Sequence, residues 1–287
     1  MTRPQAILAL WVACVIWGAA FPLTKLVLHD ASPMAFTAAR FLVATLLVAP
    51  LLRDLRPEEW RGGAVLGGLL SVGFACQTIG LLWTTASRSG FLTSLYIPFT
   101  PLIVLLVYRR LPDRRALVGL ALAVAGMIVL THPRHLESGL NRGDGLTILC
   151  AFAFAAHMVA TGYFATRARV LQLMMAQVAV SAVLTGLATP LIEVPRLSPT
   201  PFVLGMVAYE ALLASLIAIR LQIAAQQVLS PTYAALVFTL EPVIAALSSL
   251  ALLGDRLSPL QWLGGAGILV GSLLPEWQRR AEDPPTR

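Results

Sequence analysis

Glu241 is the residue whose type and position demand the most explanation, because a carboxylate stands there inside a long apolar stretch. An ionised carboxylate in hydrocarbon costs several kcal/mol unless a partner compensates its charge. Three roles are open on the sequence. Glu241 could form an ion pair with an interior cation such as Lys25 or Arg40, bind the ammonium group of a substrate, or carry a coupling proton.

Prolines interrupt two apolar stretches at corresponding positions. Pro98 and Pro101 leave the carbonyls of Ser94 and Ile97 without their usual helical partners. Irregular backbone at membrane depth is tolerated where it lines a cavity or is buried in protein. We therefore predict hinges at these prolines and at Pro242, with a binding centre between the two segments. The expected members of that centre are Tyr96, Phe99, Thr100 and the segment Phe238–Pro242, which includes Glu241.

The first apolar stretch places Trp17, Phe21 and Thr24 on one helical face. Pro22 removes a backbone donor and releases the carbonyl of Gly18, which predicts a kink and a further hinge. Aromatic residues four positions apart either line a substrate path or pack in the core. The kink favours the substrate path for Trp17 and Phe21.

Further polar and aromatic side chains are candidates for the substrate path. Gln77 shares a stripe with small residues, which either lines a pore or packs against a neighbouring helix. His157 contacts substrate, senses pH or is a hydrogen-bonded packing residue. Arg40 is an interior cation or contacts a substrate carboxylate, and Tyr233 is a weaker candidate. Glu210 is a second intramembrane carboxylate, which we expect nearer a membrane surface.

The elements that must position these residues are ten apolar stretches, each near the ~20 residues that a transmembrane helix needs. Hydrophobic residues make up 57% of the chain and charged residues 12%, against about 25% charged in soluble domains. Stretches such as 117–130 are apolar all round, whereas barrel strands alternate. The predicted fold is an all-α integral membrane protein with ten transmembrane helices. The spans are 5–28, 33–52, 62–83, 89–108, 115–132, 145–166, 172–192, 202–226, 230–253 and 259–277.

Basic residues concentrate in alternate connections. With a cytoplasmic N-terminus, 13 of the 21 Lys and Arg residues lie inside, five outside and three within spans. This bias predicts that both termini are cytoplasmic, and it accounts for the net charge of +7 without a nucleic-acid partner. The first stretch lacks a following signal-peptide cleavage site, so we expect a true span there. The three cysteines lie in apolar spans without metal-ligand spacing.

The chain consists of two copies of one five-helix pattern. Gly119 and Gly126 match Gly264 and Gly271 at a shift of 145 residues. Five is an odd number, so the second copy enters the membrane from the opposite face. The halves then form inverted repeats, which place a substrate site near the midplane between them. We predict repeats at 1–140 and 141–278, followed by a cytoplasmic tail at 279–287.

Several motifs follow one another in a fixed order along the chain. They are Trp17-Gly18-Ala19-Ala20-Phe21 with Lys25, Arg40-Phe41, Pro101, Glu241-Pro242, Leu253-Gly254-Asp255-Arg256-Leu257-Ser258 and Gly264-Gly265-Ala266-Gly267-Ile268-Leu269. Together they resemble the EamA-type branch of the drug/metabolite transporter superfamily over essentially the whole chain. One departure is Phe154-Ala155, which stands where the second repeat should carry a Trp-Gly pair.

The resemblance implies a carrier of ten helices in inverted repeats, with spans 1, 3, 4, 6, 8 and 9 around a central cavity and spans 5 and 10 at the periphery. Such proteins move small metabolites and commonly export them. Within the family the chain looks most like bacterial amino-acid exporters of the YddG type, whose substrates include aromatic amino acids. This implies a place in the bacterial inner membrane.

The function expected from these interpretations is export of amino acids, aromatic ones included, or of related small metabolites, by alternating access. We expect a monomer in membrane lipid with a small-molecule substrate. A multidrug or nucleotide-sugar carrier is the alternative within the superfamily, and a passive channel is also open. An intramembrane enzyme is a remote alternative, because the sequence has no zinc motif, nucleophile turn or Asp-rich cluster. It has no P-loop either, and we expect no cofactor.

Overall fold

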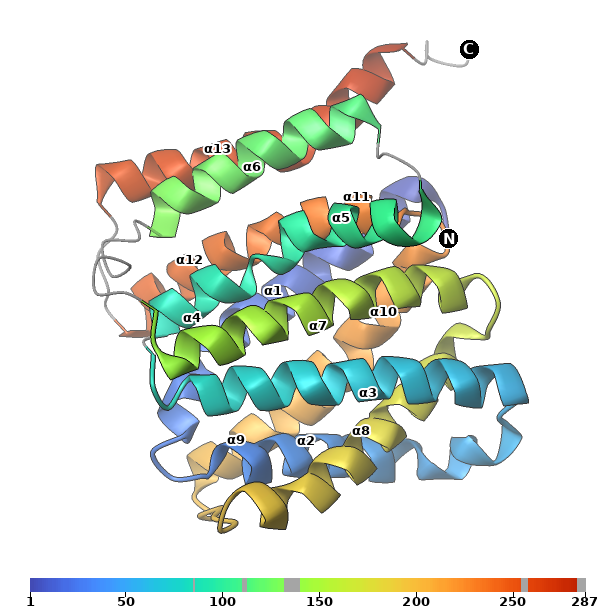
Figure 1. The fold of residues 1–287 in the computed structure, drawn as a ribbon, viewed down its shortest axis with the longest axis vertical. Helices are drawn as coiled ribbons and strands as arrows, with labels where there is room; N and C mark the ends of the chain where they lie inside the picture. Colours follow the sequence, from blue (N-terminus) through green and yellow to red (C-terminus); the bar gives the residue numbers. More distant parts are fainter. Residues whose placement is uncertain (85, 110–112, 132–139, 254–257, 283–287) are drawn as a thin grey trace.

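The computed structural model describes residues 1–84, 86–109, 113–131, 140–253 and 258–282, and these ranges are helical apart from short connections (Figure 1). The helices are α1 (Arg3–Val27), α2 (Pro33–Val48), η1 (Ala49–Asp54), α3 (Pro57–Gly80), α4 (Ala86–Thr93), α5 (Tyr96–Tyr108), α6 (Arg114–Thr131), α7 (Arg142–Ala165), α8 (Val170–Ile192), α9 (Pro201–Tyr209), η3 (Glu210–Ile217), α10 (Ala218–Gln226), α11 (Pro231–Val237), η4 (Phe238–Leu240), α12 (Glu241–Leu253) and α13 (Pro259–Glu282).

Seven helical stretches in the described ranges are long and apolar enough to cross a membrane. They comprise α1, α3, α7, α8, the stretch from Ser89 to Tyr108, the stretch from Pro201 to Gln226, and the stretch from Pro231 to Ser248. Two shorter apolar helices are α2 and the segment Pro259–Leu274 of α13. The all-helical architecture is therefore confirmed, whereas the count of ten spans and their inverted orientation remain predictions.

Several helices begin at a proline, which has no N–H group and so needs no hydrogen-bond acceptor at that position. α2, α3, α9 and α11 all begin at a proline, whose missing donor falls in the first turn, where donors have no intrahelical partner. The hydroxyl oxygens of Thr200 and Ser230 accept hydrogen bonds from the amides of Val203 and Tyr233, both at 3.2 Å. Local chemistry thus fixes where α9 and α11 enter the bundle.

Glycines let α3 approach α7 and α8 closely. A Cβ built at Gly63 would lie 2.3 Å from the Cβ of Ala176, and one at Gly73 would lie 2.3 Å from the ring of Phe154. Small residues at helix contacts allow the backbone-close packing that drives association in lipid. The stripe of small residues on α3 is therefore a packing surface at Gly73 rather than a pore lining.

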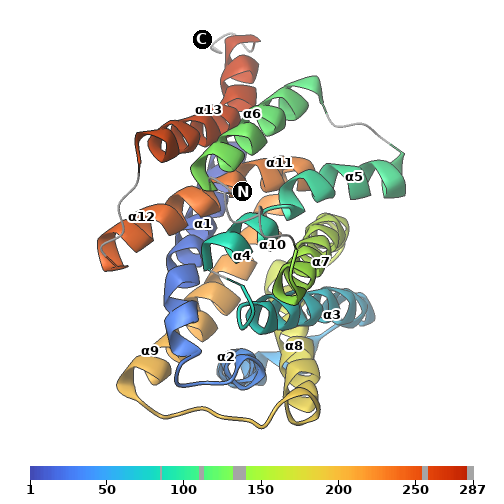
Figure 2. The same ribbon diagram turned by 60° about the vertical axis from the view of Figure 1, so that its left-hand side comes forward.

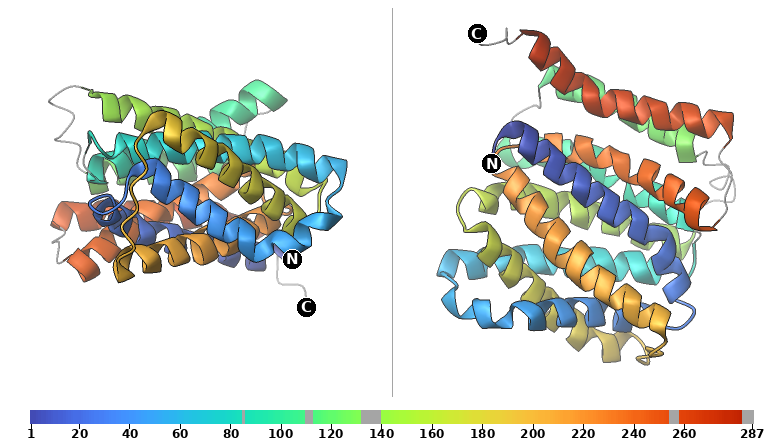
Figure 3. Two further views of the ribbon diagram at one scale, coloured as in Figure 1. Left: turned by 90° about the horizontal axis from the view of Figure 1, so that it is seen from below. Right: turned by 180° about the vertical axis from the view of Figure 1, so that it is seen from behind.

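The remaining helices are arranged around this contact. α1 packs against α10 and α12, and α7 packs against α3, α4 and α5. Figure 2 shows α6 and α13 side by side at one edge of the molecule, away from α2 and α8. Figure 3 shows α1 and α10 running next to each other on the face seen from behind. α1 begins and α13 ends at the same side of the bundle (Figure 1). We call this side the terminal end and the opposite side the far end.

Charged residues tie the connections together at both ends of the bundle. At the terminal end Arg169 donates to Oε1 of Glu59 and to Oδ2 of Asp54, both at 2.7 Å, and the Glu59 side chain is 1% exposed. These hydrogen bonds raise the pKa of Arg169 above its ordinary value. At the far end the amide of Ser32 donates to the carbonyl of Arg196 at 2.7 Å. The α2–α3 and α7–α8 connections are thus joined at one end, and the α1–α2 and α8–α9 connections at the other.

Candidate functional site

A hydrogen bond between Tyr96 and Glu241 lies where two irregular helices meet. The Tyr96 hydroxyl donates to Oε2 of Glu241 at 2.6 Å and lies 3.4 Å from the carbonyl oxygen of Phe238. Tyr96 begins α5 and is buried, whereas Glu241 begins α12 and is half-buried. A short hydrogen bond to an ionised acceptor is among the stronger ones. We call these two residues the Tyr96–Glu241 centre.

The prolines explain why the backbone is broken at this centre. α4 ends at Thr93 and α5 begins at Tyr96. Pro98 has no N–H to donate to the carbonyl of Ser94, which accepts instead from the amide of Ile97 at 3.0 Å. Pro242 likewise cannot donate to the carbonyl of Phe238, four residues earlier, and that carbonyl faces the Tyr96 hydroxyl. Each half of the sequence therefore has irregular helical backbone shortly before a proline, at residues 94–95 and at 238–240.

The break in the first half lies slightly before the position that we predicted. It falls at residues 94–95, ahead of Pro98, and Pro101 lies inside the continuous helix α5. Pro22 likewise lies inside α1, which continues to Val27. Pro242 is the second residue of α12, which begins at Glu241 after η4. The roles of the four prolines as hinges remain predictions.

The Trp-Gly pair of α1 packs against this centre. The Trp17 indole N–H donates to the carbonyl of Ala214 at 2.9 Å, and its ring meets that of Phe238 edge to face at a centroid distance of 5.4 Å. A Cβ at Gly18 would lie 2.8 Å from the Cβ of Ile244 and 2.9 Å from the carbonyl oxygen of Glu241. Trp17 thus provides an aromatic wall, and Gly18 lets α1 approach α12 at the carboxylate-bearing residue.

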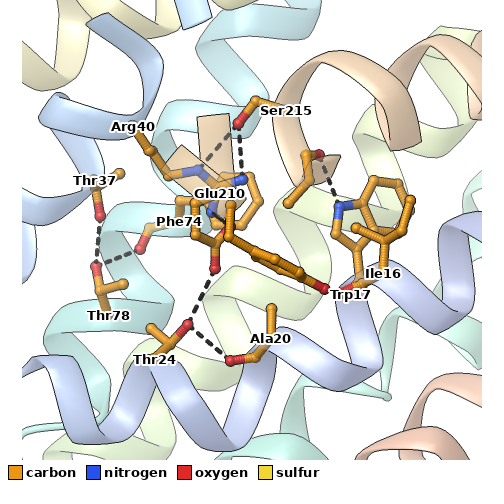
Figure 4. Close-up of polar contacts among 12 residues, drawn as sticks. Ile16, Trp17, Ala20, Thr24, Thr37, Arg40, Phe74, Thr78, Glu210 and Ser215 are labelled. Carbon is orange, nitrogen blue, oxygen red and sulfur yellow. Dashed lines mark hydrogen bonds and ion pairs between the residues drawn. The ribbon is translucent and has the colours of Figure 1, made fainter. Parts of the chain in front are cut away.

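A second polar cluster joins α2 to η3 (Figure 4). Arg40 donates from Nη1 to Oε2 of Glu210 at 2.8 Å, and the two side chains are 6% and 4% exposed. Its Nε and Nη2 lie 3.2 and 3.1 Å from Oγ of Ser215. The guanidinium group also lies 4.3 Å from the ring centroid of Phe74, and the Thr24 hydroxyl lies 3.1 Å from Oε1 of Glu210. This is a buried ion pair with hydrogen bonds to both partners.

This cluster corrects the ion-pair role that the sequence left open for Glu241. Glu241 does not pair with Arg40, because Arg40 is engaged by Glu210. It does not pair with Lys25 either, since the Lys25 ammonium donates to the carbonyls of Leu81 and Thr84. Glu210 is buried inside the bundle, and its expected place nearer a membrane surface remains a prediction. The interior-cation interpretation of Arg40 is therefore correct, with a different carboxylate as its partner.

The partners of Trp17 and Arg40 lie in one distorted helical segment. η3 is a π-helix from Glu210 to Ile217, and it contains both Ala214 and Ser215. The Tyr209 hydroxyl, one residue before it, donates to the carbonyl of Ile16 in α1 at 2.6 Å. π-helical turns are frequent at functional sites because they re-aim backbone and side-chain groups. Here the turn presents a carbonyl to α1 and polar side chains to α2.

His157 lies in a third cluster, between α7 and α8. Its Nε2 is 2.9 Å from Oε1 of Gln177, and both residues are buried. The hydroxyl of Thr161 and Nε2 of Gln177 are buried without a hydrogen-bond partner in the described structure. The contact with Gln177 fits the packing interpretation of His157 better than a role at the Tyr96–Glu241 centre.

The other predicted path residues contact different neighbours. Nε2 of Gln77 lies 3.4 Å from Oγ1 of Thr93, between α3 and α4. The remaining contacts are from the Thr100 hydroxyl to the carbonyl of Tyr96 at 2.7 Å, from the Phe99 ring to that of Phe152 at 6.4 Å, and from the Arg3 guanidinium to the Tyr233 ring at 4.6 Å. The side chain of Phe21 lies outside the described part of the chain. Trp17, Tyr96, Thr100 and Glu241 are thus the predicted residues that lie together.

Several residues of these clusters were missing from the predicted site. Ser215 and Gln177 carry no signal in the sequence beyond being polar residues within apolar spans. Glu210 did carry a signal, since an intramembrane carboxylate needs a partner. The spacing between Arg40 and Glu210 spans 170 residues, so only the tertiary structure reveals that they pair.

Hydrogen bonds join α7 to the end of α10 and to the residue that follows it. Nε2 of Gln226 donates to the carbonyl of Met158 at 2.9 Å, and Nε2 of Gln227 donates to the carbonyl of Ala165 at 3.0 Å. α11 packs against both α5 and α7. Of these contacts, the packing of α11 on α5 joins the two halves of the sequence.

The chemistry available at the centre is ionic and hydrogen-bonding recognition. Among the described residues, no group of three or more His, Cys, Asp or Glu side chains could hold a metal ion. A half-buried carboxylate, a tyrosine hydroxyl and two aromatic rings are suited to binding a small cationic or ammonium-bearing group.

Comparisons with known proteins agree with the fold. A transporter from Archaeoglobus fulgidus, described as uncharacterized, is 31% identical over 274 residues, which cover 95% of this chain and 86% of the relative. The inner membrane transporter YedA of Escherichia coli K12 is 26% identical, covering 91% and 87%. A probable amino-acid metabolite efflux pump of the same strain is 25% identical, covering 94% of each chain.

A crystal structure of a protein with 19% sequence identity matches the fold at a TM-score of 0.81, covering 98% of this chain and all of the other. At that identity the match speaks for the fold alone. The model of the EamA-like transporter family matches twice, at residues 4–132 and 141–275. These two matches cover nearly the whole length, so the chain belongs to the EamA-like transporter family and is a membrane transporter rather than an enzyme.

Proposed function

We propose that this protein is a secondary carrier that exports amino acids or closely related small metabolites across a bacterial inner membrane. The observation that carries the proposal is the half-buried carboxylate of Glu241, which meets Tyr96 where both halves of the chain break their helices. Relatives named as probable amino-acid metabolite efflux pumps support the substrate class.

The proposed mechanism is alternating access by two inverted five-helix repeats, at 1–140 and 141–278, with ten spans and both termini in the cytoplasm. The repeats rock about the Tyr96–Glu241 centre and bend at the irregular backbone near Pro98 and Pro242. On this account a monomer suffices.

The experiment is an uptake and efflux panel of amino acids with purified protein in liposomes, with and without a proton gradient. We expect a saturable flux for one or more amino acids. Counterflow separates a carrier from a channel, because unlabelled substrate on the far side accelerates a carrier and leaves a channel unaffected. Flux without such acceleration would contradict the carrier mechanism, and no flux of any amino acid would contradict the substrate class.

The variant that addresses the site is Glu241→Gln, which keeps the size of the side chain and removes its charge. We expect it to insert and fold but to lose most of its transport. Glu58→Gln is the matched control, because Glu58 lies exposed in the first turn of α3. Full transport by Glu241→Gln would remove Glu241 from the mechanism.

A further inference from the structure

The Tyr96–Glu241 centre offers acceptor capacity for a positively charged group. A carboxylate accepts about four hydrogen bonds, and the donor to Glu241 in the described part of the chain is the hydroxyl of Tyr96. The residue is partly exposed. Glu241 therefore has free lone pairs and, when ionised, the negative charge to bind an ammonium group.

Two aromatic residues belong to the helices that meet at this centre. Trp17 and Phe238 meet edge to face at 5.4 Å, and the Tyr96 hydroxyl lies near the Phe238 carbonyl. Aromatic rings attract a cation with their faces and add to the attraction of a carboxylate where water is excluded. Carboxylate, carbonyl and aromatic rings all favour the same sign of charge in the ligand.

Arg40 and Lys25, the two predicted interior cations, have other partners in the described part of the chain. Arg40 uses its guanidinium on Glu210, on Ser215 and on the face of Phe74. The Lys25 ammonium donates to two carbonyls at the end of α3, Leu81 and Thr84. Releasing Lys25 would leave these two carbonyls without this donor. Releasing Arg40 would leave the buried carboxylate of Glu210 without its counter-charge. These two residues are thus part of the framework and not of the ligand site.

We propose that the carrier recognises its substrate through the ammonium group alone, and that no cationic side chain binds a substrate carboxylate. The substrate class is then primary amines with an apolar or aromatic side chain: amino acids, and equally their amides and decarboxylated amines. This inference rests on the proposed function, because it assigns the substrate class of the same site.

The test is a ligand series on the wild-type protein, so it requires no variant to fold. The probes are phenylalanine, phenylalaninamide, phenethylamine and N-acetylphenylalanine, whose binding to purified protein is followed by intrinsic tryptophan fluorescence and by competition in counterflow. We expect the first three to bind with dissociation constants within about tenfold of one another. N-acetylphenylalanine, which lacks the ammonium charge, should bind at least about 30-fold more weakly, because one partner of a buried charge pair is missing.

Variants then assign the effect to Glu241. Glu241→Gln should weaken phenylalanine, phenylalaninamide and phenethylamine by one common factor of about 30 or more, and leave N-acetylphenylalanine unchanged. Tyr96→Phe keeps the carboxylate charge and should weaken the three amines by less than that factor. Glu58→Gln should leave all four unchanged, and the melting temperature of each variant reports whether it folds.

The outcomes separate the inference from the function on which it rests. Binding of phenylalanine and N-acetylphenylalanine without phenethylamine would show that the carboxylate is recognised, and would overturn the inference while the carrier remains. Binding of phenylalanine alone would show that both charges are required, and would overturn the inference in the same way. If none of the four binds while other amino acids are carried, the proposed substrate class of apolar amines is wrong. Absence of any amino-acid flux would refute the proposed function itself.

Discussion

The buried ion pair between Arg40 and Glu210 allows a sharp test of which charges support the fold and which bind substrate. At 2.8 Å and an effective dielectric constant near 20, their attraction is about 6 kcal/mol. Much of this is offset by the cost of removing both charges from water. Glu210→Gln leaves a buried arginine without its counter-charge, and we expect the free energy of unfolding to fall by about 3–5 kcal/mol.

Removing both charges should restore most of that loss. In the double variant Arg40→Met, Glu210→Gln, the methionine lies against the ring of Phe74, and the glutamine can still accept from the Thr24 hydroxyl. Replacing a buried ion pair by neutral groups is often neutral for stability, so we expect it within about 1 kcal/mol of the wild type.

The assay is reversible unfolding in mixed detergent micelles, followed by tryptophan fluorescence, with phenethylamine binding measured on the same samples. We expect binding by the double variant within a few-fold of the wild type. Two results would refute the reasoning. A double variant no more stable than Glu210→Gln would show that the charges are not a compensating pair, and a stable double variant that no longer binds would make Arg40 a ligand.

Three further predictions concern the framework. Gly18→Ala forces a Cβ against Ile244 and should lower the unfolding free energy by about 1–3 kcal/mol, with a parallel loss of transport. Trp17→Phe leaves the Ala214 carbonyl without its donor and should cost about 1–3 kcal/mol in the same assay. Arg169→Ala removes the partner of a buried carboxylate and should lower the melting temperature without changing substrate affinity.

Each of these variants has a matched control in the same chain. A Cβ at Gly68 would meet nothing within 4 Å, so Gly68→Ala should be harmless. Trp11 is 38% exposed on the surface of α1, and Trp11→Phe should change little. Arg167 stacks on the exposed ring of Tyr163, so Arg167→Ala should leave the melting temperature near that of the wild type. Equal losses in a variant and its control would contradict the contact assigned to it.

The sequence was sufficient for the helical fold because hydropathy marks each membrane segment and prolines mark helix starts and breaks. Proline chemistry led directly to the segments around Pro98 and Pro242, since a missing N–H has the same consequence in any tertiary context. The break at 94–95 lies before Pro98 because the Ser94 carbonyl accepts from another donor, the Ile97 amide. Only the three-dimensional structure reveals this change of donor.

The pairing of charges could not be read from the sequence in the same way. Lys25, Arg40, Glu210 and Glu241 all had to be compensated inside the bundle, but hydropathy does not say which cation meets which carboxylate. The structure pairs Arg40 with Glu210 through η3, a π-helical segment that has no clear sequence signal. The same limit holds for His157, whose partner Gln177 lies on the next helix.

The claim that the Tyr96–Glu241 centre binds the substrate can be tested directly by chemical protection. A hydrophobic carbodiimide modifies carboxyl groups in apolar surroundings. Mass spectrometry reports the modified fraction, as N-acylurea and as any amide formed with the amine, at Glu241 and, as an internal reference, at the ion-paired Glu210. Saturating phenethylamine should lower the modification of Glu241 several-fold and leave that of Glu210 unchanged. Equal modification of Glu241 with and without a ligand shown to bind would contradict the account.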